Sequence, residues 1–496
     1  MGIPSYYRTL VRTYPHLVRR CAKPIDWLWM DYNCLIYHCL RRPDLRPYPG
    51  LAGQDAWERE LIQAIVAYTQ KVATLVKPTQ GVYIGIDGVV PMAKMKQQRL
   101  RRFKSSWMAA QAAANTGPQA ASWDTNAITP GTAFMGLVRR ALEALVKTRK
   151  GWVLSSSDEP GEGEHKVMEQ IRTRSGPTDT HAIYGLDADL VVLSLLTQDT
   201  LRRSGATPSL VLFREEIDKG TLKRDAEGEE VFQWFSIDVL RDILATTISV
   251  RDYCFAMTLL GNDFLPSSLS FKVRDGGHDE LLRLLSESRV PLLQDDDTLS
   301  TEGLAALLGR FATLEEARLT QFLVRKGRQA LPPMAVGEEQ WPLAEQAEAF
   351  LLHRGRLVPS WRALTRSTFP SSTALYTSGL HWVWDYYRGL DVCYNWYYPW
   401  ALPPLWGDLK ESLSPSAAPP VALRKGEIST AEQLCLVLPP SSAHLLPSHR
   451  TFQQRAPEFF PTEFHFDSVG KHFFWECEAE IPIPSLLEVK RILGRV

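Results

Sequence analysis

Seven acidic residues of this sequence have the types and spacing needed to form one anionic site. They are Asp31, Asp87, Glu162, Glu164, Asp187, Asp189 and Asp263. Four of them follow short apolar runs that are typical of buried strands. Since alternate residues of an extended chain point the same way, Asp187 and Asp189 could face that site together. Glu162 and Glu164 stand in PGEGEHK, at the start of a helical stretch.

Carboxylates gathered in this way repel one another strongly unless cations neutralise them. Hard divalent ions with oxygen ligands, Mg²⁺ or Mn²⁺, suit such a set. Two such ions about 4 Å apart can activate a water and stabilise the leaving oxygen of a phosphodiester. Taken singly, each acid is more simply a helix cap or a surface group. The prediction of a metal site therefore depends on their joint occurrence.

A basic segment begins seven residues after Asp87. Residues 94–104 read KMKQQRLRRFK and hold six basic side chains among eleven residues. On a helix, one stripe of about 100° contains four residues, Lys94, Gln98, Arg101 and Arg102. Arginine forks and lysine point charges suit a terminal phosphate. A solvated helix face is the alternative, but the closeness to Asp87 favours phosphate binding.

The elements that must position these residues alternate between strand and helix patterns. Amphipathic stretches at 57–76 and 134–146 separate four strand candidates, at 27–30, 82–86, 152–154 and 182–184. This alternation predicts an α/β fold with a mostly parallel central sheet flanked by helices. In such sheets, ligand sites gather beyond the carboxyl ends of the strands, which is where the acids stand.

The chain divides into four predicted parts, which are a core at 1–290, a helical and aromatic-rich region at 291–410, a linker or loop at 411–428 and a last part at 429–496. Within the core, the Ala-rich residues 105–127 are expected to be partly helical and exposed. Nine of the nineteen residues from 382 to 400 are Trp or Tyr. Most of these are assigned to a lobe interface, and a smaller share to stacking on single-stranded nucleic acid.

Composition narrows the class of protein. The 496 residues carry no formal net charge, so attraction to a polyanion must come from a local patch. The seven cysteines are odd in number and lack CxxC spacing, which predicts neither disulfides nor a zinc site. No signal peptide or membrane span is apparent in the sequence. These features favour an intracellular protein, cytoplasmic or nuclear.

Longer motifs carry a resemblance to a known family. In chain order they include MGIPSYYR, MDYNCLIYH, GIDGVVPMAKMKQQRLRRF, DEPGEGEHKVMEQIR, YGLDADLVVLSLLT, LLGNDFLP, GLHWVWDYYRG, NWYYPWALPPLWGDL and FFPTEFHFD. Their order and content resemble the XRN family of 5′→3′ exoribonucleases over essentially the whole chain. Motifs of this length are far more specific than a short pattern.

The resemblance implies a role for each matching residue. All seven acids would bind metal, with two Mg²⁺ or Mn²⁺ ions as cofactors. Lys94, Gln98, Arg101 and Arg102 would form a pocket for a 5′-monophosphate, and Trp396 would stack on a terminal base. The family has a base-stacking histidine six residues after the first aspartate. Here Tyr37 occupies that position and His38 follows, so either side chain could stack.

The implied activity is processive hydrolysis of 5′-monophosphorylated single-stranded RNA to nucleoside 5′-monophosphates. The implied core is a PIN/FEN-like nuclease fold, and the partner is single-stranded RNA, bound by a monomer without a membrane. The sequence is expected to be a compact form with only the two conserved catalytic regions. A virus-encoded origin is one interpretation of that form.

Two other functions are compatible with parts of this pattern. A flap-type DNA nuclease would share a related acidic site on a related fold. A non-catalytic RNA-binding or scaffold protein would need no intact acidic set. The basic segment and the aromatic region favour an RNA exonuclease over the first, and the seven acids favour it over the second.

Overall fold

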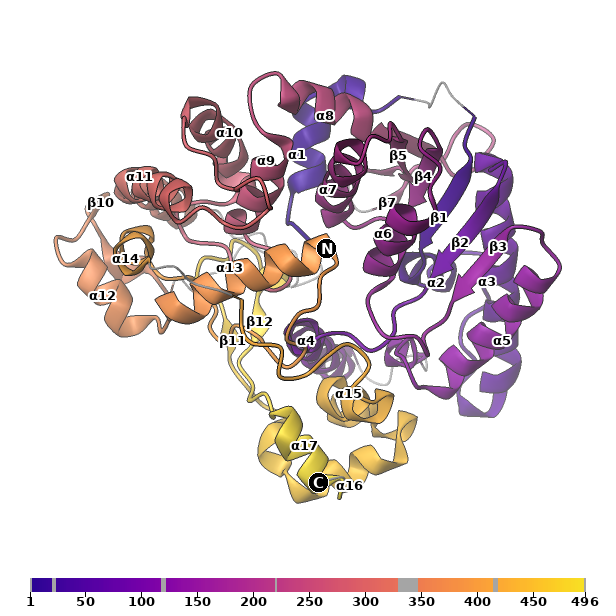
Figure 1. Cartoon of the computed structure of the whole chain (residues 1–496). Coiled ribbons are helices and arrows are strands. Elements are labelled where there is room, and N and C mark those ends of the chain that lie inside the picture. Colours follow the sequence, from indigo (N-terminus) through magenta and orange to yellow (C-terminus); the bar gives the residue numbers. More distant parts are fainter. Residues whose placement is uncertain are drawn as a thin grey trace.

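A computed structural model describes residues 2–19, 24–116, 122–218, 221–328, 347–413 and 418–494. Its centre is a six-stranded sheet in the order β3-β2-β1-β4-β5-β8 (Figure 1). The first five of these strands run parallel, and β8 pairs with β5 in the antiparallel sense. The strands are β1 Trp27–Asp31, β2 Gly81–Gly85, β3 Trp152–Ser155, β4 Thr180–Tyr184, β5 Ser209–Glu215 and β8 Phe232–Ser236.

The two faces of the sheet bury different helices because side chains alternate along each strand. Leu28 and Met30 of β1 join a hydrophobic cluster with α2, α3 and α5. Trp29 points the other way, into a larger cluster with α1 and α6–α9. Both faces are therefore covered, as expected for a parallel sheet. The helices of this part are α1 Tyr6–Thr13, α2 Asn33–Leu40, α3 Gln54–Val76, α4 Met92–Thr116, α5 Ala133–Lys147, α6 Gly163–Arg174, α7 Asp189–Arg203, α8 Ile237–Ala245 and α9 Val250–Ala256.

The second region is mainly helical and packs against the core. Figure 1 shows α10, α11, α12 and α14 grouped on one side of the molecule. It shows α15, α16 and α17 together below α4. The larger hydrophobic cluster has members in both regions, from Ile3 near the N-terminus to Val489 of α17. The helices are α10 Gly277–Glu287, α11 Thr301–Gly327, α12 Trp361–Thr368, α13 Thr373–Arg388, α14 Trp406–Ser412, α15 Thr430–Val437, α16 Pro447–Arg455 and α17 Leu486–Ile492.

Three two-stranded pairs complete the described strands. They are β6 Ile217–Asp218 with β7 Thr221–Leu222, β9 Leu352–His353 with β10 Arg356–Leu357, and β11 Phe466–Asp467 with β12 Glu478–Ala479. The last pair lies against α4.

The predicted fold class is confirmed, including the mostly parallel sheet and the helical, aromatic-rich second region. Each of the four strand candidates coincides with a strand of the sheet. In the Ala-rich stretch 105–127, α4 continues to Thr116, and residues 117–121 lie outside the described residues. So do residues 414–417 of the predicted linker. The division into four parts remains a prediction.

Among the described residues, no single helix is long and apolar enough to cross a membrane. One pair of helices, Ile237–Ala245 and Val250–Leu260, meets the length and composition test jointly but is bent by 103°. The six described cysteines, Cys34, Cys39, Cys254, Cys393, Cys435 and Cys477, are free thiols.

Candidate active site

The sheet brings four of the predicted acids to one edge. Asp31 is the last residue of β1, and Asp87 lies two residues beyond the end of β2. Asp187 and Asp189 follow β4. Because β1 lies between β2 and β4 in a parallel arrangement, the ends of all three strands meet at the same edge.

The PGEGEHK segment brings the two glutamates to this edge. Glu162 is the N-cap of α6, and Glu164 lies in its first turn. The amide of Gly163 donates to Asp87 Oδ1 at 2.7 Å. A Cβ atom at Gly163 would lie 2.7 Å from the Gly85 carbonyl oxygen and 2.8 Å from Asp31 Oδ1. Only glycine therefore allows α6 to begin so close to β1 and β2.

One group of oxygens has the spacing of a metal site. Asp31, Asp87 and Glu164 each offer a carboxylate oxygen within 4.8 Å of the other two. Asn33 orients Asp87 through two hydrogen bonds, one from Asn33 Nδ2 to Asp87 Oδ2 at 2.8 Å and one from the Asp87 amide to Asn33 Oδ1 at 3.2 Å. These three carboxylates fit a divalent ion with oxygen ligands.

A second group shares Glu164 with the first. Glu162, Glu164 and His165 also offer ligand atoms within 4.8 Å of one another. The His165 ring lies 3.9 Å from the ring of Tyr386. Burial, with a smaller effect of the Arg172 charge, lowers the pKa of His165 well below its ordinary value. The imidazole is therefore neutral at pH 7, the form that can bind a metal.

The remaining acids lie on the side of the N-terminal segment and the loop after α9. Asp189 is the first residue of α7. Its Oδ1 atom is buried and has no hydrogen-bond partner among the described residues. Gly2 packs against this carboxylate, since a Cβ atom there would lie 2.4 Å from Asp189 Cγ. An orphaned carboxylate oxygen of this kind also fits a cation.

Asp263 is held in a tight turn. The side-chain oxygen of Asn262 accepts hydrogen bonds from the amides of Phe264 and Leu265, both at 2.9 Å. The preceding Gly261 has φ +95°, a conformation that glycine adopts without strain. The sequence Gly-Asn-Asp thus fixes where the Asp263 carboxylate points.

Lys94 lies among the acids rather than beside them. Its Nζ atom is 2.5 Å from Glu162, 2.8 Å from Asp263 and 3.9 Å from Glu164. Burial alone would lower the pKa of Lys94, but these carboxylates outweigh that effect and raise it well above its ordinary value. Lys94 is therefore a fixed positive charge at the centre of the cluster.

One lysine cannot neutralise seven carboxylates. Burial, together with Asp87, Asp187 and Asp189, raises the pKa of Asp31 well above its ordinary value. Burial and Glu162 do the same to Glu164. Burial, Asp187 and Asp263 raise the pKa of Asp189 to about 7. These shifts show that the cluster holds excess negative charge, which added cations would stabilise.

Two of the four predicted phosphate ligands are buried on α4 with unsatisfied polar atoms. Gln98 Oε1 and Arg102 Nη1 have no hydrogen-bond partner among the described residues. Burial lowers the pKa of Arg102 to about 10, so it stays charged at pH 7. Arg101 is exposed on the same helix. A buried guanidinium donor without an acceptor is suited to an incoming anion.

The predicted base-stacking residues have different surroundings. Tyr37 on α2 is partly buried, with the Arg41 guanidinium 6.0 Å from its ring. His38 is buried, lies 3.0 Å from Glu230 and packs on the Tyr68 ring at 4.3 Å. This geometry favours Tyr37 over His38 as the stacking residue. Trp396 is only 7% exposed and stacks on Trp382 at 5.0 Å.

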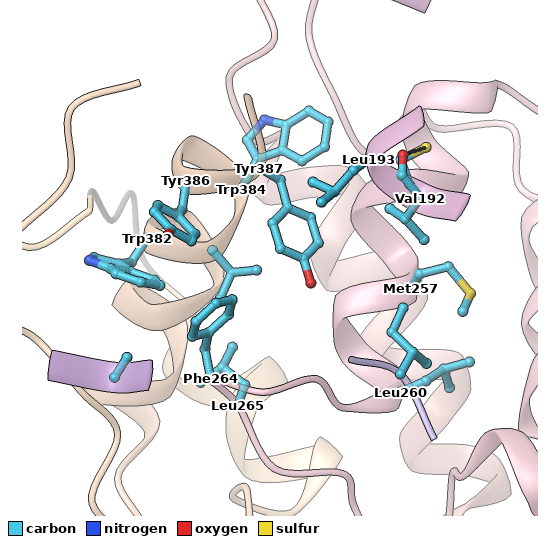
Figure 2. Close-up of a cluster of buried hydrophobic side chains, with 14 of the residues drawn as sticks. Val192, Leu193, Met257, Leu260, Phe264, Leu265, Trp382, Trp384, Tyr386 and Tyr387 are labelled. Atoms are coloured by element: carbon cyan, nitrogen blue, oxygen red, sulfur yellow. Dashed lines mark hydrogen bonds between the residues drawn. The ribbon is translucent and has the colours of Figure 1, made fainter. Parts of the chain in front are cut away.

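Sequence reasoning missed several residues that contact the acids. The Tyr386 hydroxyl donates to Glu162 Oε1 at 2.7 Å. The Tyr387 hydroxyl is buried without a partner among the described residues, and Asp189 and Asp263 help raise its pKa after burial itself. Figure 2 shows both tyrosines on α13, with Trp382 and Phe264 nearby. The other aromatic residues of WVWDYYR pack in the interface. The sequence therefore gives no signal that separates a tyrosine that contacts the acids from an aromatic residue that only packs.

Two further residues support the elements that carry the acids. Lys166, in PGEGEHK, donates from Nζ to the carbonyl oxygens of Ile86 at 2.7 Å and Ser156 at 2.9 Å. It thereby joins α6 to the ends of β2 and β3. Asn33, in MDYNCL, orients Asp87 as described above. Their place inside the quoted motifs is the signal that could have identified them.

Comparisons with known proteins match two segments of this chain. Residues 1–202 match the family model described as XRN 5′-3′ exonuclease N-terminus, and residues 369–495 match the one described as Xrn1 helical domain. The 5′-3′ exoribonuclease 2 of Candida glabrata is 29% identical over 461 residues, 74% of this chain and 44% of the relative. That of Eremothecium gossypii is 31% identical over 398 residues, 64% of this chain and 41% of the relative.

The two matched segments include all seven acids except Asp263, together with α4 and Trp396. The chain belongs to the XRN family of 5′-3′ exonucleases. It spans less than half the length of the curated relatives named above.

Proposed function

We propose that this chain is a metal-dependent 5′→3′ exoribonuclease that processively degrades 5′-monophosphorylated single-stranded RNA to nucleoside 5′-monophosphates. The observation that carries the proposal is the contact between the acid cluster and the helix α4, which holds the predicted phosphate ligands. Three of the seven acids, Glu162, Glu164 and Asp263, contact Lys94 at the start of α4. The same helix carries the buried, unsatisfied Gln98 and Arg102. Relatives named 5′-3′ exoribonuclease 2 support it.

The seven acids would hold two divalent ions, Mg²⁺ or Mn²⁺. Among the described residues, Asp31, Asp87 and Glu164 form a group of carboxylates whose oxygens lie within 4.8 Å of one another. Asp187 and Asp189 would join them from the end of β4, and Asp263 from the loop after α9. When bound, such ions supply an activated water and stabilise charge on the leaving oxygen. Lys94 limits the repulsion within the cluster and brings a positive charge next to the reacting phosphate.

The basic residues of α4 give the site its direction. Gln98, Arg101 and Arg102, with Lys94, would bind the terminal 5′-phosphate, while Tyr37 and Trp396 would stack on the first bases. With the 5′ end held there, the first phosphodiester lies over the acids. Its hydrolysis releases one nucleotide and leaves a new 5′-phosphate for the same pocket. A pocket sized for one phosphate rejects a cap or a triphosphate.

A substrate comparison tests this function. Purified chain is incubated with Mg²⁺ or Mn²⁺ and 3′-labelled single-stranded RNA that carries a 5′-monophosphate, triphosphate or hydroxyl. We expect mononucleotide release to be much faster from the monophosphate substrate than from the other two, and no activity in an Asp187→Ala, Asp189→Ala double variant. Faster cleavage of flap DNA than of RNA would identify a DNA nuclease instead. If none of the substrates is cleaved, the result would favour a non-catalytic RNA-binding or scaffold protein.

The phosphate pocket is tested separately with Arg102→Gln. Loss of one charge-assisted hydrogen bond, worth roughly 1.5–3 kcal/mol, should reduce kcat/KM on the 5′-monophosphate RNA by about 10- to 100-fold. Activity on the 5′-hydroxyl RNA should change far less. Arg140→Gln, on α5, is the matched control and should change neither. Equal losses on both substrates would contradict the pocket.

A further inference from the structure

A cavity of about 360 Å³ lies on the side of α4 away from Gln98 and Arg102. We call it the α4 cavity. It is lined by residues from five segments, which are residues 2–5, α4, residues 260–267 and 272–274, residues 397–401 and residues 470–478. Its volume lies within the range of small-molecule sites, roughly 300–1,000 Å³. Asp263 forms part of its wall, so the cavity adjoins the acid cluster.

The helix separates this cavity from the proposed phosphate pocket. Gln97 and Lys104 line the α4 cavity, whereas their neighbours Lys94, Gln98 and Arg102 do not. Successive residues on a helix point about 100° apart, so residues 97 and 98 face different sides. Arg101 lies between the two faces and lines the cavity. One guanidinium therefore stands at the border of both spaces.

The charge of the α4 cavity is positive. Six cationic side chains line it, against three anionic ones. Lys96 and Lys104 donate to main-chain carbonyl oxygens, those of Tyr398 at 2.8 Å and Cys477 at 3.0 Å, and Lys272 donates to that of Gly470. Glu476, one of the three anionic side chains, pairs with Arg274 at 2.8 Å, and the cations still outnumber the anions. Burial and the nearby Lys471 lower the pKa of Lys272 to about 8, and the opposing effect of Asp275 and other carboxylates is smaller.

Aromatic rings accompany these cations. Tyr397, Trp400 and Trp475 line the cavity. Trp475 is 43% exposed and stacks on Phe473, with an interplanar angle of 12°. The Arg274 guanidinium lies 5.4 Å from the Trp475 ring. Exposed aromatic faces beside arginine and lysine are the features that bind a base together with its phosphate.

We propose that the α4 cavity binds the nucleoside 5′-monophosphate released by hydrolysis, before it leaves the protein. This inference rests on the proposed function. After each cleavage, the incoming RNA must place its new 5′-phosphate where the previous one was held. The freed nucleotide therefore needs a route that the RNA does not occupy. The α4 cavity offers such a route, from Asp263 past Arg101 to the exposed Trp475.

Binding is measured by titration calorimetry on the full chain with Mg²⁺, using adenosine 5′-monophosphate, adenosine and inorganic phosphate as separate probes. We expect the monophosphate to bind more tightly than either part alone. Removing a stacking partner in Trp475→Ala should weaken binding about tenfold, and Lys471→Gln should weaken it similarly. Gln98→Ala should change it by less than about twofold.

Trp475→Ala removes an exposed side chain, so the variant should fold. Phe350→Ala is the matched control, because Phe350 is 42% exposed and does not line the cavity. With labelled RNA, the inhibition constant of adenosine 5′-monophosphate should rise in Trp475→Ala in step with its dissociation constant. The single-turnover rate of the first phosphodiester cleavage should stay unchanged.

The two proposals fail in different ways. Unchanged monophosphate binding in both Trp475→Ala and Lys471→Gln would overturn the cavity proposal while leaving RNA hydrolysis intact. So would an equal loss in Gln98→Ala, since that places the nucleotide in the 5′-phosphate pocket. Binding that depends on Trp475 and Lys471 in a chain that hydrolyses no RNA would support the cavity and refute the proposed function.

Discussion

At the scale of single residues, the acid cluster is shaped by neighbours that carry no negative charge. Gly163 lets α6 begin against two strands and donates to Asp87 Oδ1, and Asn33 bonds to Asp87 Oδ2 and to the Asp87 amide. Lys94 supplies one positive charge among several carboxylates. The geometry of the site thus depends as much on these three residues as on the acids themselves.

Asn33→Ala tests this dependence. Loss of both hydrogen bonds leaves the Asp87 carboxylate held by the Gly163 amide, and removal of such supporting contacts reduces metal affinity by roughly 10- to 100-fold. We expect weaker Mn²⁺ binding by titration calorimetry, with an unchanged far-ultraviolet circular dichroism spectrum. Asn126→Ala is a suitable control, since Asn126 bonds to Ser442, away from the acids. Equal Mn²⁺ affinity in Asn33→Ala and wild type would show that Asp87 needs no support.

At the scale of elements, the second region is held together by buried polar contacts as well as apolar ones. Glu315 of α11 accepts a hydrogen bond from the amide of Trp406, the first residue of α14, at 3.2 Å. Burial raises the pKa of Glu315 to about 7. The carboxyl is therefore protonated at acidic pH in the folded protein, although the unfolded chain would ionise it.

This contact predicts a pH dependence of stability. Since the folded pKa lies above the unfolded value of 4.5, the free energy of unfolding should fall as pH rises from about 4.5 to 7. In Glu315→Gln the side-chain oxygen can still accept the hydrogen bond, but the side chain cannot ionise. The variant should therefore not lose stability by this route as pH rises. Thermal melting should show the variant no more stable than wild type at pH 5, but more stable at pH 8 by up to about 3 kcal/mol. A constant difference at both pH values would contradict the assignment.

At the scale of the whole molecule, α4 joins the nuclease core to the end of the chain. Arg99 is fully buried and donates to main-chain carbonyl oxygens of Leu436 at 2.7 Å, Pro482 at 3.1 Å and Phe459. Its guanidinium also packs on the Phe103 ring at 4.4 Å. Together with the continuous hydrophobic cluster, this makes the C-terminal part a structural component of the core.

Arg99→Met should therefore destabilise the whole chain. Three carbonyl groups lose their donor, and an unsatisfied buried group costs roughly 1–3 kcal/mol, so we expect a loss of about 3 kcal/mol or more. Urea unfolding followed by fluorescence should still show one transition, because the cluster is shared. Arg101→Met, on the exposed side of the same helix, should lie within about 0.5 kcal/mol of wild type. Two separate transitions would show that the parts unfold independently.

Much of the core could be predicted from the sequence because its signals are local. Apolar runs of four or five residues marked β1 and β2, and the acids directly after them marked the sheet edge. The contributions of Asn33, Tyr386 and Tyr387 could not be predicted in the same way. Their side chains meet the acids only across long sequence separations, and an interface tyrosine has the same local pattern as one that contacts a glutamate.

The seven acids and the basic stripe of α4 were determined by the sequence itself, since residue type and periodicity decide which side chains can bind metal or phosphate. Three features were decided only by the tertiary structure. Lys94 enters the acid cluster, His38 bonds to Glu230 while Tyr37 stays accessible, and the two faces of α4 open onto different spaces. The physical reason is that helical periodicity sets which residues share a face, whereas only packing sets what each face meets.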